Sequence, residues 1–283
     1  MQVGRISPIT TTKFLDLLVN EELFEKEKPK EEAQKGPVIP EEKDLILDKT
    51  VECPICEMKF TTKMMKSGKA KLLGTDLDLR TKYEGLDATK YDAVRCSHCG
   101  FSALSRYFVR LTPTQTKMIK ENICSRVKIT ESGDEIYSYE EAIERYKLTL
   151  ACAVVKQAKA SEKGYICLKS AWLLRGYAEK LEADGELTAE KKAELQAEEM
   201  EYLKNAYEGF AAARASENFP VAGMDEMTVD YLLAVLAFEI GNIQVASSMI
   251  SRVLTAPGAG QRMKDKARDL KEMIVEKIKA EKQ

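Results

Sequence analysis

Histidine is scarce in this sequence: His98 is the only one among 283 residues. This excludes the two-histidine helix of zinc proteases, and it makes a histidine-dependent catalytic triad implausible, because His98 already lies inside a cysteine motif. No glycine-rich phosphate-binding loop is present either. Carboxylate or lysine chemistry stays open, but no pair of such residues is singled out. We therefore expect a protein that is not an enzyme.

Long apolar runs and an excess of one charge are also missing. The longest apolar run, residues 232–238, is far shorter than the roughly 20 residues that span a bilayer. The first twenty residues contain no apolar core of signal-peptide length behind a basic start. We therefore expect a cytoplasmic protein that makes no contact with a membrane. The formal net charge is only −2, so no overall basic excess indicates binding to nucleic acid.

The small net charge is the result of cancellation between three regions of different composition. Residues 1–50 have a net charge of −3, residues 51–112 of +4 and residues 113–283 of −3. Glu, Lys and Pro dominate the stretch after residue 24, which has too few apolar side chains to order itself. The predicted organisation is a short helix within 1–24, a disordered acidic linker over 25–48, a zinc-ribbon-like domain over 49–112, and a helical domain over 113–283.

Cysteine, in contrast to histidine, is well represented, with seven residues in the sequence. An odd number argues against a complete disulfide framework. Four of them form two C-x-x-C pairs, Cys53-Pro-Ile-Cys56 and Cys96-Ser-His-Cys99. This spacing lets a tight turn aim two thiolates at one ion, and two such turns complete a tetrahedron around zinc. The pairs predict one structural zinc ion bound by Cys53, Cys56, Cys96 and Cys99.

Two other interpretations of these cysteines stay open: four unrelated buried thiols, or two redox-active dithiols. Redox dithiols usually open a helix within a βαβ pattern, and neither pair here does so. A site of four thiolates has no position left for water or substrate, so its zinc would be structural rather than catalytic. Zinc binding, worth about 10–16 kcal/mol, would supply the folding energy of a small domain that has few large apolar residues.

The residues around the two pairs raise further alternatives. Gly100 follows the second pair, at a place where a positive φ is often needed, whereas Glu57 occupies the matching place in the first pair at a cost of about 1–2 kcal/mol. His98 could replace a cysteine as a ligand, but its position beside Cys99 favours an exposed turn residue. The remaining cysteines, Cys124, Cys152 and Cys167, are expected to be buried thiols within helices.

Short strands and turns are predicted between the two pairs. In Thr75–Arg80, apolar and acidic residues alternate, which predicts a strand with Leu77 and Leu79 on one face and Asp76 and Asp78 on the other. The two aspartates could hold a second cation. A solvated strand face is the expected arrangement.

A basic stretch runs from residue 59 to residue 71 and contains no acid. Several zinc ribbons bind nucleic acid, and contacts with phosphate need such a patch. The other interpretation is a strand face with outward, solubilising lysines, and the small number of aromatic residues for base stacking favours it. The candidate nucleic-acid-binding residues are Lys59, Lys63, Lys66, Lys69 and Lys71.

Helices are predicted through most of the last 170 or so residues. Small and large residues at the spacing of tetratricopeptide helices occur three times: Ala142 with Tyr146, Ala206 with Phe210, and Ala234 followed by Gly241, Ala246 and Ile250. The period is irregular, so a generic helical bundle is the alternative, and Trp172 is expected to pack in the core. The predicted helices span about 113–128, 138–160, 163–183, 188–217, 225–239, 242–255 and 260–281.

The segments around Cys53, around Cys96 and at Ala171-Trp-Leu-Leu-Arg175 resemble an uncharacterised bacterial family, with members mostly from Gram-positive lineages. The resemblance covers roughly residues 45–255 and places the four cysteines in the family's zinc motifs. It implies a cytoplasmic protein with a small β-rich zinc-ribbon-like module followed by a tetratricopeptide-like stack of antiparallel helices, mainly α overall. It implies no established activity.

These observations favour a zinc-binding interaction protein without enzymatic activity. Stacked helical hairpins bury their own faces and leave a groove for a protein or peptide partner. The alternative is a nucleic-acid-binding regulator that uses the lysines of residues 59–71. One structural zinc ion is the expected cofactor in either case.

Overall fold

The structure is a computed structural model that describes residues 40–129 and 133–280. The predicted short helix within residues 1–24 lies outside the described residues, as does the predicted linker up to residue 39. The end of that linker differs from the prediction, because residues 42–48 form helix α2 (Glu42–Leu45) and the start of strand β1 (Ile46–Glu52). Leu45 and Ile46 are buried there, so the folded part begins before the predicted boundary at residue 49.

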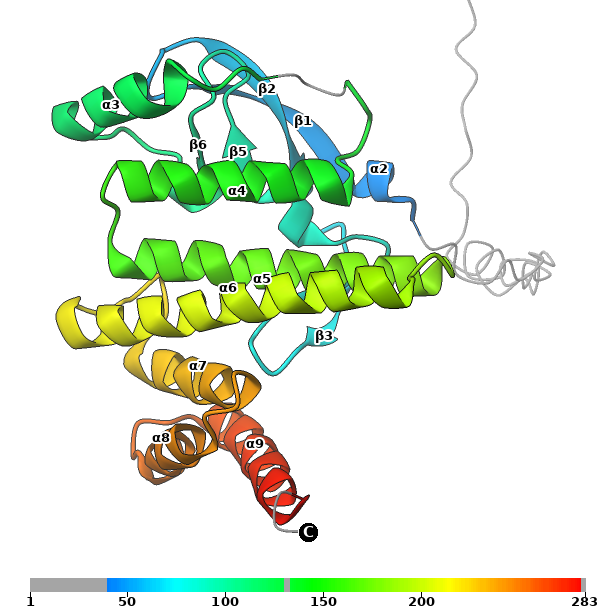
Figure 1. Ribbon diagram of the computed structural model, residues 1–283, viewed down its shortest axis with the longest axis vertical. Coiled ribbons are helices and arrows are strands. Elements are labelled where there is room, and N and C mark those ends of the chain that lie inside the picture. Colours follow the sequence, from blue (N-terminus) through cyan, green and yellow to red (C-terminus); the bar gives the residue numbers. More distant parts are fainter. Residues whose placement is uncertain (1–39, 130–132, 281–283) are drawn as a thin grey trace, which may run out of the picture. The chain divides into compact units, whose positions relative to one another are not determined.

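Three antiparallel pairs of strands make up the region between residues 46 and 104 (Figure 1). In the first pair, β1 and β2 place Val51 opposite Phe60 and Asp48 opposite Lys63. The second pair is short and the third is fully buried. Short 3-10 turns follow the second and third pairs. The strands after β1 are β2 (Lys59–Met65), β3 (Leu72–Thr75), β4 (Thr81–Tyr83), β5 (Ala93–Arg95) and β6 (Ser102–Leu104).

The segment Thr75–Arg80, predicted as a strand, is instead the turn that joins β3 to β4. Leu79 has a φ of 72°, and its N–H donates to the carbonyl of Asp76 at 3.1 Å, which closes the turn. Leu77 and Leu79 pack against the apolar cluster of the last three helices. The alternation of apolar and acidic residues therefore correctly indicated that this segment is partly buried. The prediction of a strand was wrong, because the segment is a turn whose leucines pack against helices.

Helices account for most of the remaining chain, as predicted, and the protein is mainly α. Several of them begin at residues whose side chains cap the first turn. Thr112 and Gln115 form a capping box with Pro113 at the first helical position, and Asp225 accepts from the N–H of Thr228. The helices are α3 (Pro113–Ile119), α4 (Tyr139–Val155), α5 (Ala160–Ala183), α6 (Ala189–Ser216), α7 (Glu226–Glu239), α8 (Ile243–Thr255) and α9 (Gln261–Ala280).

The first of these helices is shorter than the predicted range of 113–128. Helix α3 ends at Ile119 and continues as a single wide turn over Lys120–Cys124, in which hydrogen bonds span five residues. Ile119 and Ile123 are both buried by this segment. They belong to the same apolar cluster as Cys53 and Cys96, so the segment forms one wall of the region around the four cysteines.

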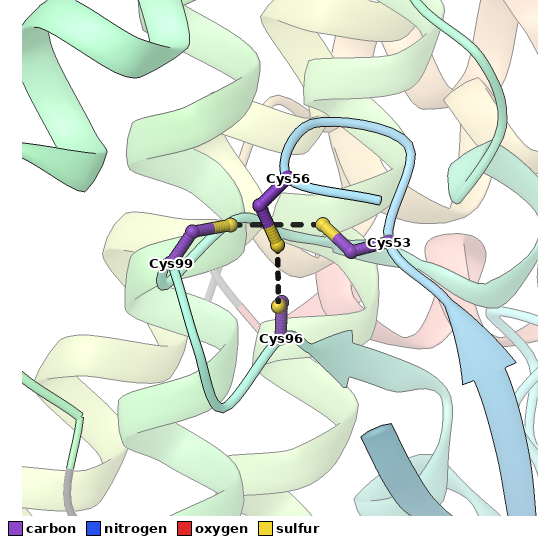
Figure 2. Close-up of side chains that lie close together, drawn as sticks. All are labelled: Cys53, Cys56, Cys96 and Cys99. Carbon is purple, nitrogen blue, oxygen red and sulfur yellow. Dashed lines mark hydrogen bonds between the residues drawn. The ribbon is translucent and has the colours of Figure 1, made fainter. Parts of the chain in front are cut away.

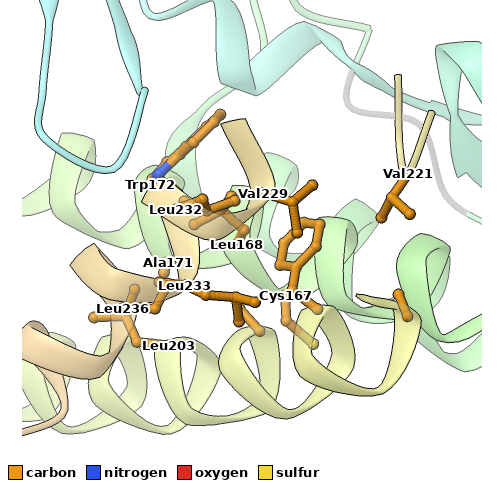
Figure 3. Packing of buried hydrophobic residues seen from close by; sticks show 13 residues of the cluster. Cys167, Leu168, Ala171, Trp172, Leu203, Val221, Val229, Leu232, Leu233 and Leu236 are labelled. Atoms are coloured by element: carbon orange, nitrogen blue, oxygen red, sulfur yellow. The ribbon is translucent and has the colours of Figure 1, made fainter. Parts of the chain in front are cut away.

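Consecutive helices from α4 to α9 pack against one another, with short connections between them (Figure 1). The closest pair is α5 and α6, where Gly164 faces Gly209. A Cβ atom at Gly209 would lie 2.6 Å from the Cα atom of Gly164, so only glycine permits this approach. The apolar cluster of α5, α6 and α7 contains Trp172, as predicted, together with Leu203 and Leu233 (Figure 3).

The small and large residues that indicated stacked helices are all buried. Each of the four alanines at a small position is fully inaccessible to solvent, and Gly241 forms the turn between α7 and α8 with a φ of 83°. Small side chains let neighbouring helices approach, and the large side chain one turn later fills the space beside them. The buried positions are Ala142, Tyr146, Ala206, Phe210, Ala234, Ala246 and Ile250.

The strands and the helices share apolar cores. Helix α4 packs on β5 and β6, and Ala93 and Leu104 of those strands join one cluster with Ala142 and Tyr146 of the helix. Leu77 of the β3–β4 turn reaches the cluster of α7, α8 and α9. The described residues accordingly form one compact unit rather than two separate bodies on either side of residue 112. Among the described residues, no helix is both long and apolar enough to cross a lipid bilayer.

Candidate metal centre

The two cysteine pairs lie in two strand connections that face each other (Figure 2). Cys53 and Cys56 belong to the connection between β1 and β2, and Cys96 and Cys99 belong to the connection between β5 and β6. The two connections are far apart in sequence, and their approach requires the packing of both strand pairs. The predicted pairing of the two motifs at one point is therefore confirmed by the fold.

Both connections have the same backbone hydrogen bonds. In the first, the N–H of Cys53 donates to Met58 at 3.0 Å and the N–H of Glu57 donates to Cys53 at 2.9 Å. In the second, Cys96 donates to Phe101 at 2.9 Å and Gly100 donates to Cys96 at 3.0 Å. The N–H of Ile55 also donates to the Sγ atom of Cys53 at 3.4 Å. Such turns aim two sulfur atoms at one point and offer backbone dipoles to their negative charge.

The residue after each pair adopts the left-handed conformation. Gly100 has a φ of 77° and Glu57 has a φ of 60°. Glycine takes this conformation without steric cost, whereas a residue with a Cβ atom loses about 1–2 kcal/mol. The equivalence of these two positions, expected from the sequence, is confirmed, and the first turn keeps its shape in spite of the glutamate.

The spacing of the sulfur atoms fits a tetrahedral ion. The Sγ atoms of Cys53 and Cys99 are 3.6 Å apart, those of Cys56 and Cys96 are 3.7 Å apart, and all four lie within 4.8 Å of one another. Corners of a regular tetrahedron with metal–sulfur bonds of about 2.3 Å are about 3.8 Å apart. Disulfide sulfurs would be at about 2.0 Å, and all four cysteines are free. The four cysteines can therefore hold one metal ion.

The crowding of the four sulfurs changes how readily each thiol ionises. Hydrogen bonds from Cys53 and Cys99 lower the pKa of the Cys96 thiol, and the same contacts raise the pKa of the Cys53 and Cys99 thiols. A divalent ion replaces these hydrogen bonds by bonds to four thiolates, because a coordinating thiol is deprotonated outright.

Apolar side chains surround the four cysteines. Cys53 and Cys96 are fully buried, and their neighbours Phe101 and Ile119 are inaccessible to solvent. Cys56 and Cys99 are partly buried. The apolar side chains thus enclose the site on the side of Cys53 and Cys96, which suits a site with a structural role.

The other sulfur and nitrogen ligands near the site stay outside it. His98 is exposed, and its Nε2 atom bonds the carbonyl of Lys59 at 3.1 Å, across the gap between the two turns. Cys124 lies partly buried in the surrounding apolar cluster. Cys152 and Cys167 are buried in the helical region, where burial raises the pKa of each thiol. The expected exposed histidine and the buried thiols at Cys152 and Cys167 are confirmed, while Cys124 is only half-buried.

Asp76 and Asp78 do not lie on a solvated strand face, and that expectation was wrong. The side chain of Asp78 is fully buried, accepts a hydrogen bond from the Nε1 atom of Trp172 at 2.9 Å, and pairs with Arg175 at 2.9 Å. Asp76 pairs with Arg80 at 2.8 Å. Arginines therefore neutralise both carboxylates. Within residues 40–129 and 133–280, the only cluster suited to a metal ion is the one of four cysteines.

This ionic cluster was missed by sequence reasoning because its members come from four elements. Arg175 of α5 also pairs with Glu199 of α6 at 2.7 Å and with Glu239 of α7 at 3.7 Å. Arg80 adds a bond to Glu179 of α5 at 2.6 Å. The result is a clamp that attaches the β3–β4 turn to three helices. Alternating acids in the sequence were the one signal that could have indicated it.

The five lysines of residues 59–71 are spread over β2 and the turn after it. Three of them already have partners: Lys63 pairs with Asp48 at 3.1 Å, Lys71 pairs with Glu84 at 3.4 Å, and Lys66 donates to the carbonyl of Asp44 at 2.9 Å. Lys59 stands opposite Glu52 across the strand pair. Lys69 makes no hydrogen bond or ion pair with the described part of the chain. This arrangement favours the interpretation of the five lysines as a solubilising face over their interpretation as a phosphate-binding patch.

Comparison with known proteins identifies the family of the chain. Residues 46–274 match the model of a family described as an uncharacterized protein conserved in bacteria (DUF2225), and this stretch includes both cysteine pairs and the helices through α8. Searches against curated proteins and against solved structures gave no match. The four-cysteine cluster and the helices that follow it are thus features of a chain that belongs to the bacterial family of uncharacterized conserved proteins DUF2225.

Proposed function

We propose that the four cysteines bind one zinc ion and that its role is structural. The observation that supports this most is the tetrahedral spacing of the four sulfur atoms, with two separations of 3.6 and 3.7 Å. Zinc prefers four thiolates in this geometry. Four protein ligands leave no open position for water or substrate, so the ion would stabilise the two turns without taking part in a reaction.

Metal analysis of the purified protein tests this proposal. We expect one equivalent of zinc after expression without added metal, and less than a tenth of that in the double variant Cys53→Ser, Cys99→Ser. Cys167→Ser serves as the matched control, because Cys167 is a buried thiol in the helical core. A folded wild-type protein without bound metal would contradict the proposal, and so would full zinc content in the double variant.

We infer further that the protein is a cytoplasmic, non-enzymatic scaffold for a protein or peptide partner. Helices that pack in sequence order expose a continuous outer surface, and stacks of helical hairpins generally use such a surface for partners. The strand region is attached to these helices by shared apolar cores and by the clamp around Asp78. A rigid body of this type suits recognition more than chemistry, which agrees with the single histidine of the sequence.

The scaffold role is tested by crosslinking in the native bacterial host followed by purification of the tagged full chain. We expect one partner protein in stoichiometric amount. Absence of any stoichiometric partner across growth conditions would contradict the scaffold role, while the zinc site would stand as a separate proposal.

A further inference from the structure

A small cavity lies between helices α4 and α6, and it shares no lining residue with the apolar cluster around the four cysteines. Its volume is about 300 Å³, and its lining residues are Leu150, Glu198, Glu201, Tyr202 and Asn205. Glu201 and Asn205 are exposed, so the cavity opens to solvent on their side. A volume of this size accommodates one or two side chains rather than a large ligand, which is the scale of an anchor pocket for a peptide.

The walls of this α4–α6 pocket are apolar in one part and acidic in another. Leu150 and Tyr202 are half-buried and pack against the apolar cluster of α5, α6 and α7, so their faces offer a fixed apolar surface. Glu198 and Glu201 place two carboxylates on the same stretch of α6. A long cationic side chain matches both parts at once, because its methylene stem packs on apolar walls while its charged head reaches the carboxylates.

The pocket has a negative electrostatic character. Burial, followed by the charges of Glu198 and Glu201 among others, raises the pKa of the Tyr202 hydroxyl to about 12. Between residues 194 and 208, α6 contains five acidic residues and one basic residue. Glu201 has no ion-pair partner in residues 40–129 and 133–280, so one of the two carboxylates of the pocket has no cation assigned to it.

One cation of the chain itself already uses the pocket. The Nζ atom of Lys147, on α4, lies 2.8 Å from a carboxylate oxygen of Glu198, on α6. The lysine side chain is 55% exposed and that of Glu198 is 28% exposed, so this pair sits at the rim. It shows that an ammonium group approaching from α4 finds Glu198 in a geometry suited to bonding, and that a partner's cation would compete with Lys147 there.

We propose that the α4–α6 pocket anchors an arginine or lysine side chain of a basic peptide segment in the protein's partner. The stem of that side chain lies between Leu150 and the ring of Tyr202, and its head binds Glu201 and Glu198. Cation–π attraction to the tyrosine ring adds to the electrostatic term. This inference rests on the proposed scaffold role and gives it a site and a partner chemistry.

A selection from a phage-displayed library of random 12-residue peptides, performed on the zinc-loaded full chain, tests the proposal. We expect the selected peptides to contain an arginine or lysine beside apolar residues. A selected peptide, synthesised with a fluorescent label, should lose at least about tenfold in affinity when its cationic anchor is replaced by norleucine, because the carboxylate of Glu201 then has no cation in the complex. Selection of neutral or acidic peptides, or of none above background, would overturn the proposal.

Variants of the protein separate the pocket from charge in general. The affinity of the double variant Glu198→Lys, Glu201→Lys for the selected peptide should be at least about tenfold lower than that of the wild type. The double variant Glu208→Lys, Glu276→Lys changes the net charge equally at exposed sites outside the pocket, and it should bind within about twofold of the wild type. Equal loss in both variants would show nonspecific attraction and overturn the pocket assignment. Circular dichroism of each variant shows whether it is folded.

Lys147 provides a second test, with the opposite sign. Lys147→Ala frees Glu198 from its internal cation, so the selected peptide should bind roughly threefold more tightly, in line with the strength of an exposed ion pair. Unchanged or weaker binding would contradict competition at Glu198.

The crosslinking experiment on the pocket variants distinguishes failure of this inference from failure of the scaffold role. If the Glu198→Lys, Glu201→Lys variant retains the partner that the wild type binds, the scaffold role stands and the pocket assignment is overturned. If the wild type itself has no partner, the scaffold role fails, whatever the peptides show.

Discussion

The strand region and the helical region of this protein are stabilised in different ways. Residues 46–104 form three separate two-stranded pairs, and β3 is exposed along its whole length. An isolated two-stranded pair is marginally stable at best in water. In α7, by contrast, nine of fourteen residues are buried, from Val229 to Ala237. The comparison teaches that apolar packing dominates in the helices. The strand pairs share apolar cores with the helices, and in addition they carry two polar attachments, the four cysteines and the ionic clamp around Asp78.

Removal of the zinc ion that we propose at the four cysteines should break this comparison most strongly. With zinc chelated, we expect the amides of β1, β2, β5 and β6 to lose protection from hydrogen exchange, because a structural zinc supplies on the order of 10 kcal/mol. Helices α7, α8 and α9 should stay protected, since their apolar cluster lies far from the cysteines in the chain. Hydrogen exchange followed by mass spectrometry measures both regions at once.

Zinc added back should restore the lost protection, which controls for damage by the chelator. Equal loss of protection in the strands and in α7–α9 would contradict the comparison, because it would show that the whole compact unit depends on the metal.

The second attachment, around Asp78, is tested by Asp78→Asn. This change removes the charge from a fully buried carboxylate that pairs with Arg175 at 2.9 Å. We expect a loss of roughly 3 kcal/mol in the free energy of unfolding, because a half-buried arginine then lacks its fully buried counter-charge. Urea unfolding followed by circular dichroism measures it.

Asp184→Asn is the matched control. It makes the same change in an exposed pair, in which Asp184 lies 2.8 Å from Lys180. The expected loss there is below about 1 kcal/mol. Similar losses in the two variants would mean that burial of the clamp contributes nothing.

Within the helical region, the contact between Gly164 and Gly209 offers a test of packing alone. Gly209→Ala places a Cβ atom 2.6 Å from the Cα atom of Gly164, so α5 and α6 must move apart. We expect a loss of about 2 kcal/mol, as for other overpacked cores, with unchanged zinc content. Gly258→Ala is the control, because a Cβ atom there meets nothing within 4 Å. A change below 0.5 kcal/mol at Gly209, in the range of surface substitutions, would show that the helices are less tightly packed than described.

The ionic clamp also predicts a dependence on pH. Burial and the nearby charge of Asp78 raise the pKa of Glu239 to about 8, although Arg175 acts in the other direction. The folded state therefore favours protonated Glu239. Its contribution to stability is full below its ordinary pKa of 4.5 and is lost as the pH rises through about 8.

Glu239→Gln keeps the shape of the protonated acid and removes this titration. Relative to the wild type, the variant should gain roughly 3 kcal/mol of stability between pH 5 and pH 8. Unfolding by urea at several pH values measures the difference. A difference that is constant with pH would contradict the raised pKa.

Interactions between residues that are close in the sequence could be predicted from it, and those between distant segments could not. The cluster of four cysteines could be predicted, because each C-x-x-C pair specifies its own turn and only the meeting of two turns was left to the fold. Helix ranges could be predicted for the same reason, since capping residues and apolar periodicity are local.

Interactions between distant segments could not be predicted. The alternation in residues 75–80 indicates two faces, but it does not say that one face meets α7–α9 while Asp78 meets Trp172 and Arg175. Likewise, the acids of α6 look like a solvated helix face until Leu150 of α4 closes one side of the pocket. Such sites depend on which elements become neighbours, and periodicity within one element does not contain that information.

The two cysteine turns allow the finest comparison, because they differ at one equivalent position. Glu57 has a φ of 60° and Gly100 a φ of 77°, and both turns have the same backbone hydrogen bonds. Glu57→Gly relieves left-handed strain of about 1–2 kcal/mol but increases the entropy of the unfolded chain, so a net gain of about 0.5 kcal/mol is expected. Urea unfolding of the zinc-loaded protein measures it. Gly100→Ala should lower the free energy of unfolding, because the added Cβ atom would lie 3.3 Å from the side chain of Val127 and the residue would keep a positive φ. If Glu57→Gly instead lowers stability, the glutamate has a role that the equivalence of the two turns does not explain, and zinc competition assays on the same variant would show whether that role concerns the metal.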